Sequence, residues 1–277
     1  MTTARRSVPS KLTTAALITG ASRGIGAVYA DRLAKRGYDL ILVARSEERI
    51  KELSARLTTE TGRSAAPLTA NLNDKRDLAK VETTLRDDPT ITMLVNNAGV
   101  AAVASLLNAD VEKMEDMIAL NITALTRLTY AAAPALVQRG AGTIINIASV
   151  VGISPETLNG VYGATKAYVI ALSHSLQHEL ADKDLRVQAV LPAATATDIW
   201  EIAGLHYRNL PPSIVMSPED VVDAALVGLD QGELVMLPSL QDGDEWNRFE
   251  AARRAISQQF GHSVPAPRYE IGVRRSA

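Results

Sequence analysis

Two side chains with complementary proton chemistry, Tyr162 and Lys166, stand four residues apart. The apolar period of this segment predicts a helix over Tyr162–Ala181, so both side chains lie on one helix face. A phenol ordinarily ionises near pH 10. A positive charge at about 4 Å, in an effective dielectric of about 20, favours tyrosinate by up to roughly 4 kcal/mol, or about 3 pKa units. The pair is therefore a candidate general acid and base near working pH, although such a spacing is common by chance.

A second group of residues has the composition of a phosphate-binding loop. Gly20, Gly24 and Gly26 form a G-x-x-x-G-x-G pattern between a predicted strand, Thr14–Thr19, and a predicted helix, Ile25–Arg36. Glycine allows a sharp turn and lets backbone N–H groups approach a pyrophosphate closely. The helix N-terminus adds free donors and a partial positive charge. The loop therefore predicts a dinucleotide site.

Three further motifs follow in order along the chain. Asn96-Asn97-Ala98-Gly99 comes after the fourth predicted strand, Ser149 precedes Tyr162 by 13 residues, and Pro192 follows the sixth predicted strand. Each motif is weak alone. Together with the glycine loop, in this order and at these spacings, they resemble the short-chain dehydrogenase/reductase family over nearly the whole stretch from Thr13 to Met236.

The resemblance implies a catalytic set of Asn121, Ser149, Tyr162 and Lys166. In this family pattern Tyr162 exchanges the proton and Ser149 hydrogen-bonds and orients the substrate oxygen. Lys166 also bonds the nicotinamide ribose, and Asn121 holds a water that links Lys166 to solvent. The cofactor contacts that we expect, beyond Tyr162 and Lys166 themselves, come from the loops that follow the strands. They are Gly20, Ser22, Arg23, Gly24, Ile25, Gly26, Arg45, Asn71, Leu72, Asn97, Ala98, Gly99, Pro192, Thr195 and Thr197.

Two positions depart from the family pattern. Ala193 replaces the usual glycine after Pro192 and adds a methyl group beside the expected nicotinamide. Asn71 stands where an aspartate usually meets the adenine, and its amide oxygen can still accept a hydrogen bond from the adenine amino group.

The end of the second predicted strand indicates which dinucleotide is bound. An acid there would bind the ribose 2′-OH of NAD(H) and repel a 2′-phosphate. Here the strand ends Val43-Ala44-Arg45-Ser46 and the first acid is Glu47. Arg45 and Arg23 are placed to clamp a 2′-phosphate from two sides. We expect NADP(H) as the preferred cofactor, with NAD(H) as the alternative.

Strand-length apolar runs alternate with segments of helical period, as in a doubly wound α/β protein with a parallel sheet of about seven strands, Rossmann-type. The remaining predicted strands are Asp39–Ala44, Ala65–Thr69, Thr92–Asn96, Thr143–Ala148, Arg186–Leu191 and Leu234–Met236. The remaining predicted helices are Glu47–Thr59, Lys75–Leu85, Glu112–Gln138 and Pro218–Gln231. We expect a single domain over residues 1–277, with a substrate loop at about 193–217. A C-terminal extension follows at about 238–277, with a helix around Glu245–Phe260.

Three segments are expected to line the substrate pocket: Val100–Leu107, Val150–Asn159 and Ala194–Met216. The last is long for a connection and too apolar for a solvated linker, so we expect a lid over cofactor and substrate. From the apolar composition of this loop we expect a mainly apolar, medium-sized carbonyl substrate. The expected apolar lining is Val103, Val151, Ile153, Leu158, Trp200, Leu205, Tyr207, Ile214 and Met216. The charged or titratable groups expected beside it are Glu156, Asp198, Glu201, His206 and Arg208.

Composition narrows the function classes. The net charge of −2 argues against nucleic acid as a partner, and no apolar run approaches a membrane span. The N-terminal stretch Met1–Lys11 has no apolar core of a secretory signal, so we expect a short flexible lead and a cytoplasmic protein. The four histidines lack an acidic partner set, and no metal is expected. By resemblance, Glu112–Gln138 and Tyr162–Ala181 pack against symmetry mates in a homodimer or homotetramer.

The leading hypothesis is an NADP(H)-dependent reductase of ketones or aldehydes that also runs as an alcohol dehydrogenase. A 3-oxoacyl-thioester reductase is the alternative among enzymes, whereas an enoyl reductase would space its Tyr and Lys more widely. A non-catalytic NADP(H)-binding sensor or scaffold is the alternative from another class. Such a protein would be expected to lack part of the set Ser149, Tyr162 and Lys166, and none is missing.

Overall fold

This computed structural model describes residues 14–140 and 142–269, so the N-terminal stretch Met1–Lys11 lies outside the described residues. The chain divides into two compact units, Met1–Ser239 and Leu240–Ala277. The division into a single domain with an extension from about residue 238 remains a prediction. Each unit is described by itself below.

The first unit is built on a parallel sheet with the order β3-β2-β1-β4-β5-β6-β7. The chain reverses its direction of winding between β1 and β4, which makes their carboxyl ends a site where ligands bind in such sheets. The strands are β1 (Ala15–Thr19), β2 (Asp39–Ala44), β3 (Ala65–Thr69), β4 (Ile91–Asn96), β5 (Gly142–Ile147), β6 (Leu185–Val190) and β7 (Val235–Met236). The predicted α/β fold is confirmed.

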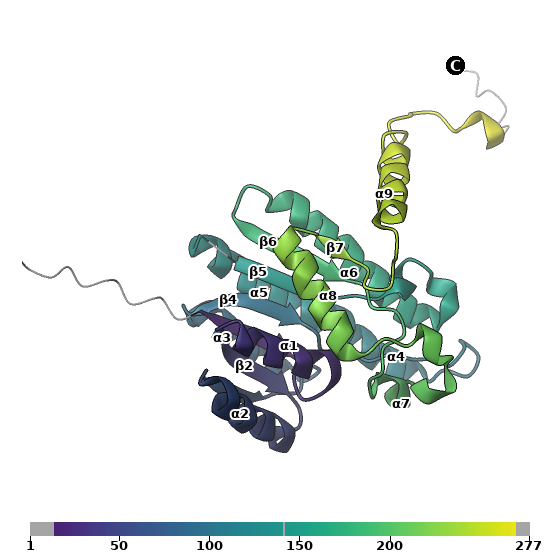
Figure 1. Cartoon of the computed structure of the whole chain (residues 1–277). Coiled ribbons are helices and arrows are strands. Elements are labelled where there is room, and N and C mark those ends of the chain that lie inside the picture. The colour runs from purple at the N-terminus through teal and green to yellow at the C-terminus, as the bar shows by residue number, and fades with distance from the viewer. Residues whose placement is uncertain (1–13, 141, 270–277) are drawn as a thin grey trace, which may run out of the picture. The chain divides into compact units, whose positions relative to one another are not determined.

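Helices cover both faces of this sheet because the side chains of each strand alternate between two cores. Ala16 and Ile18 of β1 face one core, and Ala15 and Leu17 face the other. The first core is closed by α1 (Gly24–Lys35), α2 (Glu47–Thr61) and α8 (Pro218–Gln231), of which α1 and α8 lie in front of the sheet in Figure 1. The second is closed by α3 (Lys75–Asp87), α5 (Leu125–Gln138) and α6 (Gly160–Glu179).

The predicted helix Glu112–Gln138 differs in its interior. The structure has α4 (Val111–Ile118), then a π-helical stretch at Ala119–Ala124, then α5. A π-turn adds a residue to the helical repeat and re-aims the side chains that it carries. Asn121 lies in that stretch, so the irregularity falls on a predicted catalytic residue.

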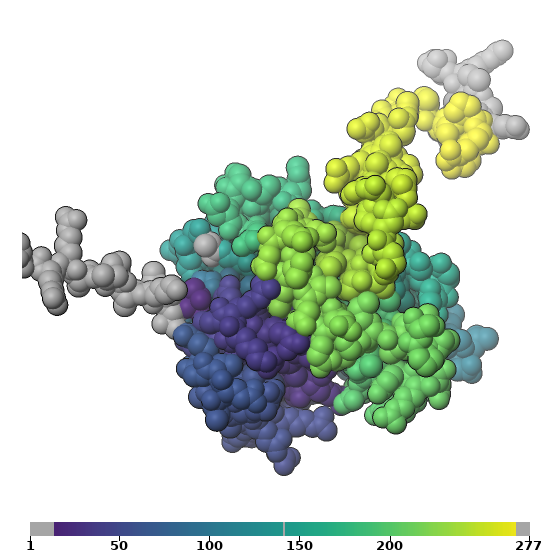
Figure 2. Space-filling view, in the orientation of Figure 1, coloured from purple at the N-terminus to yellow at the C-terminus, as the bar shows by residue number. Residues whose placement is uncertain are grey.

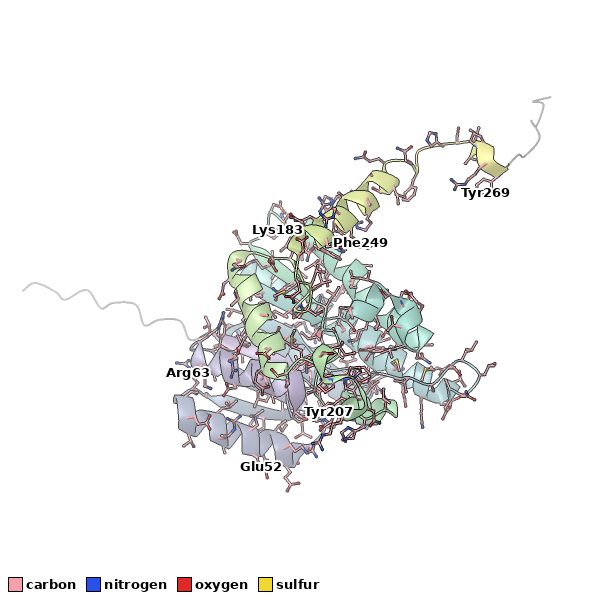
Figure 3. All side chains as sticks on the ribbon, turned by 45° about the vertical axis from the view of Figure 1, so that its right-hand side comes forward. Glu52, Arg63, Lys183, Tyr207, Phe249 and Tyr269 are labelled. Carbon is pink, nitrogen blue, oxygen red and sulfur yellow. The ribbon has the colours of Figure 1, made fainter. Side chains whose placement is uncertain are left out.

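The second unit contains one long helix, α9 (Gly243–Ser257), and a short 3₁₀ turn at Pro267–Tyr269. Asp242 caps α9 by accepting from the Asp244 N–H at 2.9 Å. Phe249, labelled in Figure 3, pairs its ring with Trp246 at 5.2 Å between centroids. Within residues 14–140 and 142–269, no helix is long and apolar enough to cross a membrane.

Gly26 provides a test of how tightly the first strand-to-helix turn is packed. A Cβ there would lie 2.4 Å from the Gly20 carbonyl oxygen and 2.4 Å from Nδ2 of Asn97. Gly26→Ala is therefore expected to lower the free energy of unfolding by roughly 1–3 kcal/mol, measured by urea titration.

Gly160→Ala is the matched control. Gly160 begins α6, and a Cβ there would meet nothing within 4 Å. Alanine is also a better helix former by about 1 kcal/mol. This variant should be neutral or slightly stabilised. Equal destabilisation of both variants would contradict the proposed packing of the turn.

Candidate active site

A cavity of about 790 Å³ opens where the carboxyl ends of the central strands meet. Its lining combines the loops after β1, β2, β4, β5 and β6 with the segment at 193–217. In Figure 2 an indentation separates the blue surface of α2 from the green surface of that segment. Because all these loops follow parallel strands, the fold brings residues far apart in sequence to one edge of the sheet.

Hydrogen bonds between the loops after β1 and β4 fix the floor of this cavity. Oγ1 of Thr19 accepts from the N–H groups of Asn97 and Ala98, both at 3.0 Å. In return, Nδ2 of Asn97 donates to the carbonyls of Thr19 at 2.9 Å and Gly20 at 3.1 Å. The side chain of Asn97 therefore holds the glycine loop in place from behind.

The start of α1 fits the phosphates of a dinucleotide. Its N-terminal N–H groups receive no side-chain cap, unlike those of α2, α3, α4, α6, α8 and α9, each of which has a capping side chain. Gly20 and Gly24 line the cavity with φ of +66° and +54°, a conformation that favours glycine. Uncapped donors beside exposed backbone form an anion site, so the residues present fit a nicotinamide dinucleotide.

One end of the cavity is rich in arginine. Arg23 and Arg45 both line it, as the sequence predicts, and Arg49 joins them from the first turn of α2. Sequence reasoning missed Arg49. Its spacing of four residues from Arg45 at the start of a helix was the available signal. Three guanidinium groups at one end suit a ligand with a phosphate there.

The three side chains of the predicted proton-transfer set meet deeper in the cavity. Oγ of Ser149 donates to the Pro192 carbonyl at 3.2 Å and hydrogen-bonds the side chain of Tyr162. Nζ of Lys166 donates to the Ile147 carbonyl at 2.9 Å and lies 5.9 Å from the centre of the Tyr162 ring. All three residues are buried and line the cavity.

Burial dominates the protonation of this group. It raises the pKa of Tyr162 to about 12, and the hydrogen bond with Ser149 opposes this only in part. It also lowers the pKa of Lys166 to about 8. The prediction that Lys166 brings the phenol close to working pH is therefore wrong, because burial raises the pKa of Tyr162 instead. The ammonium group is directed at the Ile147 carbonyl and is itself desolvated.

Asn121 lies behind the set, only 2% exposed and outside the cavity lining. Its side chain accepts from the Val100 N–H at 3.0 Å and donates to the Val100 carbonyl at 2.9 Å. It also donates to Oγ1 of Thr165 at 3.1 Å. The side chain thus fastens the loop after β4 to α6, and its role in proton relay remains a prediction.

The other predicted cofactor residues divide into two groups. Gly26 packs under the loop and does not line the cavity. The Gly20 carbonyl and Nδ2 of Asn97 occupy the space beside its Cα. The remaining predicted residues line it, namely Ser22, Ile25, Asn71, Leu72, Asn97, Ala98, Gly99, Pro192, Thr195 and Thr197. Oδ1 of Asn71 already accepts from the Asn73 N–H at 3.2 Å.

On the substrate side, six of the predicted apolar residues line the cavity: Val103, Val151, Leu158, Trp200, Leu205 and Ile214. Ile153, Tyr207 and Met216 do not; Met216 instead holds the base of the segment by pairing with Thr195. Of the predicted charged or titratable groups, only Asp198 reaches the lining. Leu210 also lines the cavity, as do Ala101, Thr157, Ile199 and Ile202, which lie within the three predicted segments but were not among the side chains expected to line it.

The described residues contain no group of three or more His, Asp or Glu side chains able to hold a metal ion. The cavity lining itself brings together a hydroxyl, a phenol and an amine from Ser149, Tyr162 and Lys166.

Comparison with known proteins decides the family. The family pattern described as short chain dehydrogenase matches residues 14–206. The chain belongs to the short-chain dehydrogenase/reductase family. The match covers the glycine loop, the arginine end and the set Ser149, Tyr162 and Lys166.

Two solved structures resemble this short-chain dehydrogenase closely. One is a short-chain dehydrogenase from Sphingobium yanoikuyae in complex with NADPH, 48% identical, with a TM-score of 0.89 over 91% of this chain and 98% of that one. The other is the bulky-bulky ketone specific alcohol dehydrogenase from Comamonas testosteroni, 42% identical, with a TM-score of 0.86 over 94% and 99%. A curated relative, the very-long-chain 3-oxoacyl-CoA reductase of Anas platyrhynchos, is 31% identical over 80% of this chain and 72% of its own length.

The buried ammonium group of this short-chain dehydrogenase should reduce its stability. A pKa lowered from 10.5 to about 8 means that the charged lysine destabilises the fold by roughly 3 kcal/mol at pH 7. Replacing Lys166 also removes the hydrogen bond to the Ile147 carbonyl, which costs about 1 kcal/mol. Lys166→Met is therefore expected to raise the free energy of unfolding by about 2 kcal/mol at pH 7.

The pH dependence tests the cause of this gain. The folded chain disfavours the charged lysine, so the penalty is complete below pH 8 and fades as pH rises through 8 to 10.5. Urea titrations at pH 7 and pH 10 should show the gain disappearing at the higher pH. Exposed Lys183, labelled in Figure 3, supplies the control Lys183→Met, for which little change is expected at either pH. A gain at Lys166 independent of pH would contradict the assignment.

Proposed function

We propose that this short-chain dehydrogenase reduces apolar ketones with NADPH and runs in reverse as an alcohol dehydrogenase. The observation that carries the proposal is one cavity with three parts. It joins an arginine-rich phosphate end, the set Ser149, Tyr162 and Lys166, and an apolar end under the segment 193–217. That the two solved relatives are an NADPH complex and a ketone-specific alcohol dehydrogenase supports it.

NADPH, when bound, supplies the hydride. The chain's own residues manage the oxygen and its proton. Ser149 donates a hydrogen bond to the substrate oxygen, and Tyr162 gives that oxygen a proton as negative charge develops on it. With a pKa near 12 the phenol is fully protonated at neutral pH, which is the form that a reduction requires. Lys166 holds the nicotinamide ribose and favours the tyrosinate that the transfer leaves behind.

The apolar end supports the choice of substrate. Trp200, Leu205, Leu210 and Ile214 of the segment line the cavity together with Val151. The one acid among the described lining residues, Asp198, pairs with Arg23. A sugar phosphate would need cations there, whereas the described arginines of the lining gather at the other end. We propose that the segment covers a bulky, uncharged ketone and excludes water from it.

A 3-oxoacyl-thioester reductase is the second candidate, which the relative from Anas platyrhynchos favours. A panel of ketones, aldehydes and 3-oxoacyl-CoA esters, followed by NADPH absorbance and repeated with NADH, separates the two. Uncharged ketones and NADPH should give the highest kcat/KM. Preference for the acyl-CoA esters would replace the first proposal, and absence of turnover on the whole panel would favour a cofactor-binding sensor.

Tyr162→Phe tests the proton donor. Only the phenol O–H is lost, so turnover should fall by roughly 10²–10⁴-fold while the Kd for NADPH stays within a few-fold. Tyr168→Phe is the control on the same helix, because Tyr168 bonds Oγ1 of Thr126 at 2.9 Å and does not line the cavity. It should keep its activity. A Tyr162 variant as active as the parent would overturn the assignment.

The surface of α4 and α5 supports assembly into a homodimer or homotetramer. Val111, Ile118 and Tyr130 expose 65%, 41% and 68% of their surface. Light scattering at micromolar concentration should give a dimer or tetramer, and Tyr130→Glu should shift it towards monomer. Val227→Glu, at an exposed site on α8 across the sheet, should not. A monomeric parent protein would contradict the proposal.

A further inference from the structure

Asp198 stands in an unexpected electrostatic position. Among the described residues it is the one acid of a cavity lining that also contains Arg23, Arg45 and Arg49. Its Oδ2 lies 2.9 Å from an Nη of Arg23, 175 positions away in the sequence. The two side chains are 50% and 38% exposed, so the pair lies at the mouth of the cavity and is open to solvent.

A neighbouring contact fixes this pairing. The residue before Asp198 packs on the glycine loop, since a Cβ on Gly24 would meet Cγ2 of Thr197 at 3.1 Å. The base of the same segment is held by two backbone hydrogen bonds, from the Ala196 N–H to the Met216 carbonyl and from the Met216 N–H to the Ala194 carbonyl, both at 2.9 Å. The chain that leads to Asp198 is therefore held beside the glycine loop by backbone hydrogen bonds at Ala194 and Ala196 and by the side chain of Thr197.

The two dinucleotides differ at the position that the arginines suit. NADPH carries a phosphate on its adenosine ribose where NADH carries a hydroxyl. A phosphate of nearly two negative charges attracts the guanidinium groups and repels Asp198, which also occupies donors of Arg23. A hydroxyl has no such charge. The carboxylate therefore weakens the binding of NADPH more than the binding of NADH.

Building on the proposed cofactor preference, we propose that Asp198 is a specificity-determining residue that weakens NADPH binding by competing with the 2′-phosphate for Arg23. Asp198 thereby reduces the difference between the affinities for NADPH and NADH that Arg23, Arg45 and Arg49 create. Asp198 is also the residue that immediately precedes α7 (Ile199–Ala203), and Ile199, Trp200 and Ile202 of this helix line the cavity. The competition therefore links the segment 193–217 to the adenosine end of the dinucleotide.

The test measures binding rather than turnover. Dissociation constants of NADPH and NADH are determined by titration calorimetry for the parent protein and for Asp198→Asn, which keeps the shape and removes the charge. Asp198 is half exposed and its side chain makes no capping bond to α7, so the variant should fold. We expect NADPH to bind roughly three- to tenfold more tightly and NADH to change less than twofold. The gain should shrink at high salt.

Glu201→Gln is the matched control. Glu201 lies three residues further along the same segment, pairs with His206 at 3.3 Å and does not line the cavity. It should leave both constants unchanged. An equal gain in this control would mean that net charge, and not competition for Arg23, is responsible, and would overturn the proposal.

Arg45→Asp separates failure of this inference from failure of the cofactor proposal. It should weaken NADPH far more than NADH, while Lys183→Asp, an equal change of charge outside the cavity lining, should affect neither. If Arg45→Asp is selective but Asp198→Asn is not, the role of Asp198 is wrong and the NADPH site stands. If Asp198→Asn weakens NADPH, the carboxylate orients Arg23 rather than competing for it, and the proposal is overturned. Equal effects on both dinucleotides in both variants would overturn the NADPH site as well.

Discussion

The clamp between Thr19 and Asn97 is the interaction on which the rest of the site depends. Four hydrogen bonds join Thr19 and Gly20, at the end of β1, to Asn97 and Ala98, which follow β4. The sheet reverses its winding between these two strands. The four hydrogen bonds set the separation of the glycine loop from the loop that leads to Val100. Gly26 has no side chain because a Cβ would occupy the space of Nδ2 of Asn97. The cofactor cradle is thus shaped by a buried polar contact as well as by its glycines.

Asn121 extends this constraint to α6. It holds both backbone polar groups of Val100 and bonds Thr165, which precedes Lys166. The loop after β4 is therefore fastened at one end to the glycine loop and at the other to α6. A displacement of either element would move Tyr162 relative to the dinucleotide cradle, and positioning errors of this kind are costly in hydride and proton transfer. The π-turn allows one side chain to reach both partners.

The sequence predicts the strands well because strands buried on both faces leave long apolar runs with clear ends. Asp39–Ala44 agrees at both ends with β2, which is mostly buried. Ala65–Thr69 agrees at both ends with β3 as well, although this edge strand is largely exposed or half-buried. The helix over Glu112–Gln138 is less well described, since a π-turn changes side-chain directions without changing composition. The family motifs locate Ser149, Tyr162 and Lys166, and these three side chains do converge in one cavity.

Other features depend on distance in space and could not be read from spacing. The Arg23–Asp198 pair joins residues 175 positions apart, and only the folded chain shows that the acid belongs to the arginine-rich end. The pKa of Tyr162 depends on how far burial outweighs the hydrogen bond with Ser149, which spacing along the chain does not give. A four-residue spacing gives the proximity of Lys166 but not the direction of its Nζ, which the Ile147 carbonyl determines.

Burial controls the protonation of both Tyr162 and Lys166 in the cavity. At neutral pH the phenol is neutral, and the ammonium group loses its proton more readily than an exposed lysine would, because neither ion is well solvated there. Reduction begins from a neutral phenol and from a dinucleotide whose nicotinamide carries no charge, so this direction meets no buried phenolate at the start. Oxidation begins with a positive nicotinamide, and that charge favours the tyrosinate that must accept the alcohol proton. In the proposed mechanism, burial opposes ionisation of Tyr162, so the charge of the nicotinamide would determine whether the phenol or the tyrosinate is favoured.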